Sequence, residues 1–148
     1  MKHLLVAIDG SDGGHAAVDE ALALAPDLGV TVTFVSVRKP APQSLGSPFY
    51  ERSLQQGLER ARNVVEQAME LAAEAGIEAD GEILEGDPTD EIVSLADNRG
   101  TDLIVVGSRG HGPLAGALLG SVSSTVAQHA QTPVLVAKQV PTRHRQVA

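Results

Sequence analysis

The stretch LIVVGSRGHGPLAGALLGS, which spans residues 103–121, decides the fold of this chain. Its first four residues are all apolar, and such a run is typical of a short strand that is buried on both faces of a parallel sheet. The strand ends at Gly107, and residues 107–120 then contain five glycines. One strand-to-helix turn does not require so many glycines. We therefore expect this loop to do more than connect a strand to a helix.

Outward from this stretch, the sequence alternates between short apolar runs and helical patterns. The run Leu4–Ile8 is as apolar as residues 103–106, so we expect both to be central strands and neighbours. Strictly alternating strands and helices predict crossover connections, and therefore an α/β, Rossmann-like, five-stranded parallel sheet with helices on both faces. The predicted strands are residues 4–8, 30–37, 77–85, 103–106 and 133–137, and the predicted helices are residues 15–28, 54–75, 88–99 and from either 114 or 121 to 131.

Local signals support several of these elements. Asp87 is a predicted N-cap, and Pro88 suits the first position of the helix that follows. Apolar residues in 54–75 repeat at alternating spacings of four and three, which predicts one apolar stripe from Leu54 to Ala75. Acidic side chains on one side of residues 77–85 predict an edge strand. The connection 38–50 contains three prolines and is long enough to be either disordered or functional.

Composition limits the function classes. The chain has 148 residues, which suits a single domain (residues 1–140) with a flexible tail (141–148). A net charge of −8 without a strong basic cluster disfavours nucleic acid, and an aromatic content of 2% leaves few rings for base stacking. There is no cysteine, no signal peptide pattern and no apolar stretch of about 20 residues. We therefore expect a cytoplasmic protein with no nucleic-acid or membrane partner.

The chemistry is expected beyond the carboxyl ends of the strands, where a doubly wound sheet binds its ligands. In the predicted sheet this point lies between Asp9 and the loop that begins at Gly107. Glycine at Gly107 and Gly110 lets backbone N–H groups approach a phosphate. A helix that starts at Ser121 offers further free N–H groups and a positive dipole end, and the hydroxyls of Ser121 and Ser123 could add donors.

Known signatures fit this loop poorly. The G-x-x-x-x-G-K-[ST] pattern is absent, which argues against a P-loop enzyme. Residues 110–115 match the loose dinucleotide fingerprint G-x-G-x-x-A, but they follow the fourth strand and start three residues late. The five histidines are scattered, so no metal site held by the protein alone is expected. Residues 123–124 lie in no G-x-S-x-G elbow, which disfavours a serine hydrolase.

The spacing Gly107-x2-Gly110-x9-Gly120-Ser121 resembles the ATP-binding branch of the universal stress protein family. The resemblance covers nearly the whole chain and includes LVAIDGS (5–11), EGDP (85–88), TDLIVVGSRG (101–110), LGSV (119–122) and TPVLV (132–136). It implies the adenine nucleotide α-hydrolase-like form of the predicted fold and a homodimer joined through the last strand. Such a dimer would cover the apolar residues Val134, Leu135 and Val136.

The resemblance also implies a role for individual residues. Asp9 would meet the nucleoside, with Ala7 just before it, and Val37 would contact the adenine, largely through its backbone. The implied cofactor is ATP, with Mg²⁺ held through its phosphate oxygens. The positions implied to hold the ribose and phosphates are Gly107, Ser108, Gly110, Gly120, Ser121 and Val122, with Arg109 and Ser123 as further contacts.

Three function classes remain open on the sequence. The first is a regulatory module in the stress response, in which ATP changes the 38–50 loop, the glycine loop or dimer contacts. The second is a slow ATPase, for which Arg109 and His111 are candidates to stabilise the transferring phosphoryl group. The third is a dimeric adaptor that needs no nucleotide. Cyclic AMP could also replace ATP, although the glycine pattern offers more donors than one cyclic phosphate needs.

Overall fold

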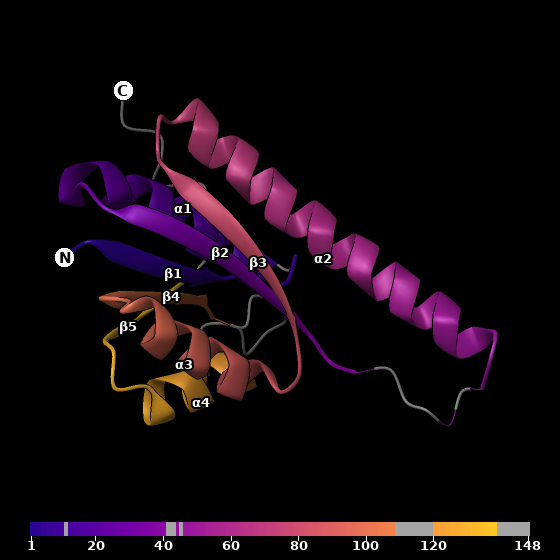
Figure 1. Ribbon diagram of the computed structural model, residues 1–148. Coiled ribbons are helices and arrows are strands. Elements are labelled where there is room, and N and C mark those ends of the chain that lie inside the picture. The colour runs from indigo at the N-terminus through magenta and orange to yellow at the C-terminus, as the bar shows by residue number, and fades with distance from the viewer. Residues whose placement is uncertain (11, 41–43, 45, 109–119, 139–148) are drawn as a thin grey trace.

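The computed structural model describes residues 1–10, 12–40, 44, 46–108 and 120–138. These residues form a parallel sheet with the strand order β3-β2-β1-β4-β5 (Figure 1). The predicted fold class and the central pair β1 and β4 are therefore confirmed. The elements are β1 (His3–Ala7), α1 (Asp12–Leu28), β2 (Thr31–Arg38), α2 (Phe49–Glu74), β3 (Ala79–Glu85), α3 (Pro88–Arg99), β4 (Leu103–Gly107), α4 (Ser121–His129) and β5 (Val134–Ala137).

Helices cover both faces of the sheet, with α1 and α2 on one side and α3 and α4 on the other (Figure 1). Successive residues of a strand point to opposite faces, so one strand serves two cores. In β1, Leu4 and Val6 pack in the core under α1 and α2, whereas Leu5 packs under α3 and α4. This double burial explains why the central strands are continuously apolar rather than alternating.

Helix α3 has the ends that its sequence predicts. The Asp90 N–H donates to the side chain of Asp87, the N-cap, over 3.1 Å, and Pro88 follows at the start of the helix. Gly100 ends the helix with a φ of +61°, in the left-handed region that glycine adopts at no steric cost. These caps fix the positions at which α3 begins, after the loop from β3, and ends.

Helix α2 begins at Phe49, inside the stretch that was predicted as a loop. Its apolar stripe packs on the sheet through Ala61, Val65, Ala68 and Ala72, as predicted, but Ala75 is exposed at the C-cap. The helix crosses β3 closely, because a Cβ atom on Gly81 would lie 2.3 Å from Val65 Cγ1. The glycine in this edge strand therefore permits the close approach of α2.

Other boundaries differ slightly from the predictions. Helix α1 begins at Asp12 instead of His15, and β3 begins at Ala79 instead of Ile77. Helix α4 begins at Ser121, the later of the two predicted starts, whereas the earlier one, Leu114, lies outside the described residues. None of the helices among the described residues has both the length and the apolar character that a membrane span needs.

Candidate functional site

A cavity of about 540 Å³ opens at the carboxyl ends of β1, β2 and β4, on the side of the sheet covered by α3 and α4. This volume falls in the range of small-molecule sites. Because β1 connects to one side of the sheet through α1 and β4 to the other through α4, the cavity lies at the point where the connections diverge. The fold therefore places a cavity where the sequence predicts the ligand.

The middle of the cavity is formed by the end of β1. Ala7, Ile8 and Asp9 line it there, and the start of α1 approaches through Gly14. A Cβ atom on Gly14 would lie 3.1 Å from Asp9 Oδ1 and 3.2 Å from the Asp9 backbone nitrogen. Glycine at this position therefore lets α1 pack closely against Asp9 without displacing the Asp9 carboxylate from the wall of the cavity.

One end of the cavity is apolar. Its walls come from Val35 and Val37 at the end of β2 and from Pro88 and Ile92 in the first turns of α3. A flat, uncharged ring system suits such walls better than a charged group does, because burying a charge without partners is costly. Lys39, just beyond the last residue of β2, lies at the edge of this end.

The opposite end of the cavity is built from the end of β4 and the first turn of α4. Gly107 and Ser108 line it on one side, and Gly120, Ser121, Val122 and Ser123 on the other. No side chain caps α4, because its N-cap is Gly120, with φ −67° and ψ 163°. The first N–H groups of a helix have no partner within the helix, so this end of the cavity presents donors and a positive dipole end.

The serine hydroxyls at this end are not equivalent. The Ser123 side chain is 2% exposed, and its hydroxyl donates to the Gly120 carbonyl oxygen over 3.0 Å. Its only hydrogen is therefore used within the helix turn, which leaves the oxygen only as an acceptor. The Ser121 side chain is exposed. Of the two hydroxyl donors that the sequence suggested for a phosphate, Ser121 is the better placed.

The structure brings most of the predicted site residues together. Arg109 and Gly110 lie outside the described residues, as does His111. The role of the others as ligand contacts remains a prediction. The predicted residues that line the cavity are Ala7, Asp9, Val37, Gly107, Ser108, Gly120, Ser121, Val122 and Ser123.

Several residues that line the cavity were not predicted from the sequence. Among them are the apolar residues Val35, Pro88 and Ile92 and the cation Lys39. Val35 could have been found, because it lies two residues before Val37 and so shares its face of the strand. Pro88 and Ile92 lie one turn apart on α3, a spacing that predicts a shared helix face but gives no sign that this face meets β2. Lys39 follows the strand in a proline-rich segment, where the sequence carries no signal for a ligand contact.

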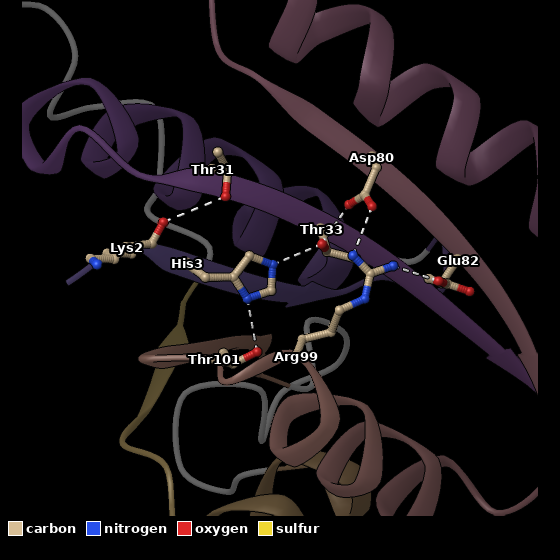
Figure 2. A network of polar contacts seen from close by, with 8 residues as sticks. All are labelled: Lys2, His3, Thr31, Thr33, Asp80, Glu82, Arg99 and Thr101. Atoms are coloured by element: carbon tan, nitrogen blue, oxygen red, sulfur yellow. Dashed lines mark hydrogen bonds and ion pairs between the residues drawn. The ribbon is translucent and has the colours of Figure 1, made fainter.

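The amino end of the sheet carries a second polar cluster (Figure 2). The His3 ring lies between two hydroxyls, with Nε2 2.8 Å from Thr33 Oγ1 and Nδ1 2.9 Å from Thr101 Oγ1. Since the Thr33 hydroxyl donates its hydrogen to Asp80, it accepts from His3 Nε2–H. Neutral His3 with its proton on Nε2 can then accept at Nδ1 from the Thr101 hydroxyl. Each side chain in this series of hydrogen bonds therefore has a partner. Burial, the largest cause, lowers the pKa of His3, and the positive charge of Arg99 adds to this effect.

Arg99, the last residue of α3, ties that helix to the edge strand. Its guanidinium donates to Asp80 over 2.9 Å and to Glu82 over 2.6 Å (Figure 2). Burial alone would raise the pKa of Asp80, but the hydrogen bonds from Thr33 and Arg99, with the charge of Arg99, outweigh it and lower the pKa. Asp102 accepts from the backbone N–H groups of Lys2 and His3, which lowers its pKa.

The described residues include no group of three or more histidine, cysteine, aspartate or glutamate side chains that could hold a metal ion.

The polar clusters at the two ends of the sheet differ in kind. The amino end is a network of side chains that bind one another, and the carboxyl end is a cavity lined by apolar side chains, Asp9, Lys39 and the start of α4. The molecule is an α/β protein with a candidate small-molecule site at the switch point of a parallel sheet.

Comparison with known proteins narrows this class. The sequence profile of the Universal stress protein family matches residues 1–138, so the chain belongs to the universal stress protein family. A universal stress protein of Thermus aquaticus is 38% identical over 138 residues, which cover 93% of this chain and 99% of that protein. The solved structure of MJ0577, a universal stress protein of Methanocaldococcus jannaschii, is similar with a TM-score of 0.83 at 28% identity, covering 94% of this chain and 96% of that one. A universal stress protein solved in complex with cyclic AMP is similar with a TM-score of 0.69 at 28% identity, covering 92% and 96% of the two chains.

Proposed function

We propose that this chain is an ATP-binding universal stress protein that acts as a nucleotide-dependent regulatory module. The observation that carries the proposal is the cavity itself, which joins an apolar end between β2 and α3 to an end that holds Gly107, Ser108 and the start of α4. A nucleotide has the same division, with a flat base at one end and anionic phosphates at the other. The Asp9 carboxylate lies between the two ends, where a ribose hydroxyl could donate to it.

ATP is the first candidate ligand because of the glycine spacing between Gly107 and Gly120. Backbone N–H groups of a glycine-rich loop and of a helix start together supply more donors than a single phosphate uses. Mg²⁺ would be held through phosphate oxygens, because magnesium in nucleotide sites commonly keeps water and phosphate ligands. Binding without fast turnover is proposed, since an efficient ATPase needs a group that orients water and charge that stabilises the phosphoryl group.

Cyclic AMP is a second candidate, and one observation favours it. A solved family member of similar structure was obtained in complex with cyclic AMP. The base is the same in both ligands, so the apolar end suits both equally. The 3′ oxygen of cyclic AMP is esterified, which leaves only the 2′ hydroxyl of its ribose to donate to Asp9. The phosphate end also discriminates, because a cyclic monoanion occupies fewer donors than a triphosphate.

We also propose a homodimer through β5. This strand lies at an edge of the sheet, and its residues Val134, Leu135 and Val136 are half-buried within the single chain. An apolar edge strand is a template for pairing with another chain. The variant Leu135→Glu should therefore sediment as a monomer, and a mass equal to that of the wild type would contradict this interface.

The direct test of the ligand is mass spectrometry of nucleotide released from gently purified protein. The stripped protein is then titrated with ATP, ADP and cyclic AMP by calorimetry, with and without Mg²⁺. We expect co-purified ATP and a Kd for ATP well below millimolar. Tighter binding of cyclic AMP than of ATP would favour the second candidate, and accumulation of ADP with Mg²⁺ would indicate hydrolysis. An empty protein that binds none of them would leave a nucleotide-independent adaptor.

A further inference from the structure

We propose that Lys39 is a specificity-determining residue of this cavity and makes it prefer anionic nucleotides to uncharged nucleosides. The inference rests on the proposed function and adds to it a residue that neither the glycine spacing nor the family resemblance indicates. It starts from the two consecutive basic residues at the end of β2, Arg38 and Lys39.

The two residues lie on opposite sides of the sheet. Val35 and Val37 pack in the core under α3 and α4, and Lys39 continues this alternation into the cavity. Arg38 lies on the other face and forms an ion pair of 2.7 Å with Glu85, its register partner in β3. Lys39 forms no ion pair with any residue of the described part of the chain. The charge of Arg38 is thus compensated by the protein, and that of Lys39 is left for a ligand.

Charge balance around the cavity points the same way. Among the described residues that line it, Asp9 and Lys39 carry the charges, and the whole chain has a net charge of −8. A nucleotide with several negative charges therefore approaches a protein that repels it, unless a local cation offsets the field. Lys39 is the cation in the described wall of the cavity.

The reach of the side chain is sufficient. Lys39 follows β2 and the phosphate-binding end begins at β4, with β1 between them. Neighbouring strands lie about 4.8 Å apart, so the two walls are roughly 10 Å apart at the strand ends. The lysine ammonium lies at the end of a flexible four-carbon stem, so it approaches a bound phosphate from the wall opposite α4. The interaction is mainly electrostatic and grows with the charge of the ligand.

The test compares Lys39→Gln with the matched control Arg38→Gln, which removes the same charge from the adjacent residue on the other face. Calorimetry with ATP, AMP and adenosine gives nine Kd values for the wild type and the two variants. Lys39→Gln should raise the Kd for ATP about fivefold, that for AMP less, and that for adenosine by less than about 1.5-fold. Arg38→Gln should leave all three within about twofold of wild type, and Lys39→Arg, which keeps the charge, should do the same for ATP. Added salt should narrow the difference between Lys39→Gln and wild type.

Three outcomes would overturn the inference. An equal loss of ATP affinity in Lys39→Gln and in Arg38→Gln would assign the effect to the net charge of the molecule. An equal loss of affinity for ATP and for adenosine in Lys39→Gln would assign the effect to packing against the base. An unchanged Kd for ATP in Lys39→Gln would remove Lys39 from the site. A wild-type protein that binds neither ATP nor adenosine would instead overturn the proposed function, so the two failures are distinguishable.

Discussion

The amino and carboxyl ends of this sheet are both polar, yet their polar groups have different partners. At the amino end, His3, Thr33 and Asp80 bind one another in a chain that continues to Arg99 (Figure 2). At the carboxyl end, β1 and β4 end at Ala7 and Gly107, which line a cavity, and α4 begins without a capping side chain. Polar residues at a strand end therefore do not by themselves mark a binding site. What distinguishes the carboxyl end is that its polar groups line a cavity.

This difference implies that the two ends of the sheet have different roles. Satisfied networks stabilise a fold, whereas donors held toward a cavity are available to a ligand. Substitutions at the amino end should thus change the free energy of unfolding and leave nucleotide affinity unchanged. Substitutions at the carboxyl end should do the reverse. For each of the following variants, both the free energy of unfolding and the nucleotide affinity are measured. A variant that changes both quantities together would argue against separate roles for the two ends.

The largest effect is expected for Gly120→Val. The backbone of Gly120 has φ −67° and ψ 163°, an extended conformation that any residue adopts, so the fold should persist. The new side chain would occupy the end of the cavity that we propose binds phosphate, and we expect ATP affinity to fall at least about thirtyfold, or roughly 2 kcal/mol. Calorimetry measures the affinity and urea unfolding the stability, with Gly120→Ala as a milder control. Wild-type affinity in Gly120→Val would remove the proposed crevice.

The next effect is expected at the other end, for His3→Ala. The variant loses the hydrogen bond that Nε2–H donates to Thr33 and the one that Nδ1 accepts from Thr101, two hydroxyl residues that are almost fully buried. At about 1 kcal/mol for each hydrogen bond, the free energy of unfolding should fall by roughly 1–2 kcal/mol. Nucleotide affinity should stay within about twofold of wild type. Thr31→Val is the matched control, because the Thr31 hydroxyl makes only a 3.5 Å contact to the Lys2 carbonyl oxygen. A His3→Ala variant that loses affinity but keeps its stability would contradict the division between the two ends.

Much of this fold was predictable because its signals are local. The ends of α3 follow from Asp87, Pro88 and Gly100, each of which acts on the backbone next to it. The central pair β1 and β4 follows from the apolar runs 4–8 and 103–106, since strands that are buried on both faces are continuously apolar. The carboxyl-end cavity follows from the strand order, and the glycine spacing within residues 103–121 points to the end of the cavity that we propose binds phosphate.

The amino-end network was not predictable in the same way. His3 and Thr33 are 30 residues apart, and Thr33 and Asp80 are 47 apart, so their contact depends on strand register. A one-residue shift of β2 against β1 would move every one of its side chains to the other face. The register is fixed by packing of the whole sheet, and no short sequence pattern encodes it. The same limit applies to Gly81, whose role depends on where α2 crosses β3.

Gly14→Ala tests the close contact that shapes the middle of the cavity, and its effect should be smaller. Alanine suits a helix better than glycine by up to about 1 kcal/mol, which offsets the strain of the new contact. Its Cβ atom would lie 3.1 Å from Asp9 Oδ1, closer than an ordinary van der Waals contact. The carboxylate must shift, so we expect ATP affinity to fall about three- to fivefold with the free energy of unfolding within roughly 1 kcal/mol of wild type. Unchanged affinity would show that Asp9 does not bind the nucleoside.

The smallest effect is that of pH on the amino end. Burial holds the pKa of folded His3 below its ordinary value of 6.5, and of the charges around it Arg99 supports this shift whereas Asp80 and Asp102 oppose it. As the pH falls below 6.5, the unfolded chain binds a proton at His3 before the folded protein does, so the free energy of unfolding decreases until the folded pKa is passed. The half-exposed position keeps this loss below about 1 kcal/mol.

Urea unfolding of wild type and His3→Gln between pH 7 and pH 5 isolates this contribution, because Gln does not titrate and the other histidines titrate in both proteins. The wild type should lose more stability than His3→Gln over this interval. A second loss is expected in both proteins as the pH falls below about 4, because the pKa values of folded Asp80 and Asp102 are lowered from 3.8 and the unfolded chain is protonated there first. Adenosine affinity, which depends on the carboxyl end, should change equally with pH in the two proteins. If His3→Gln altered that pH dependence, titration at one end of the sheet would be coupled to binding at the other, and the two ends would act as one unit.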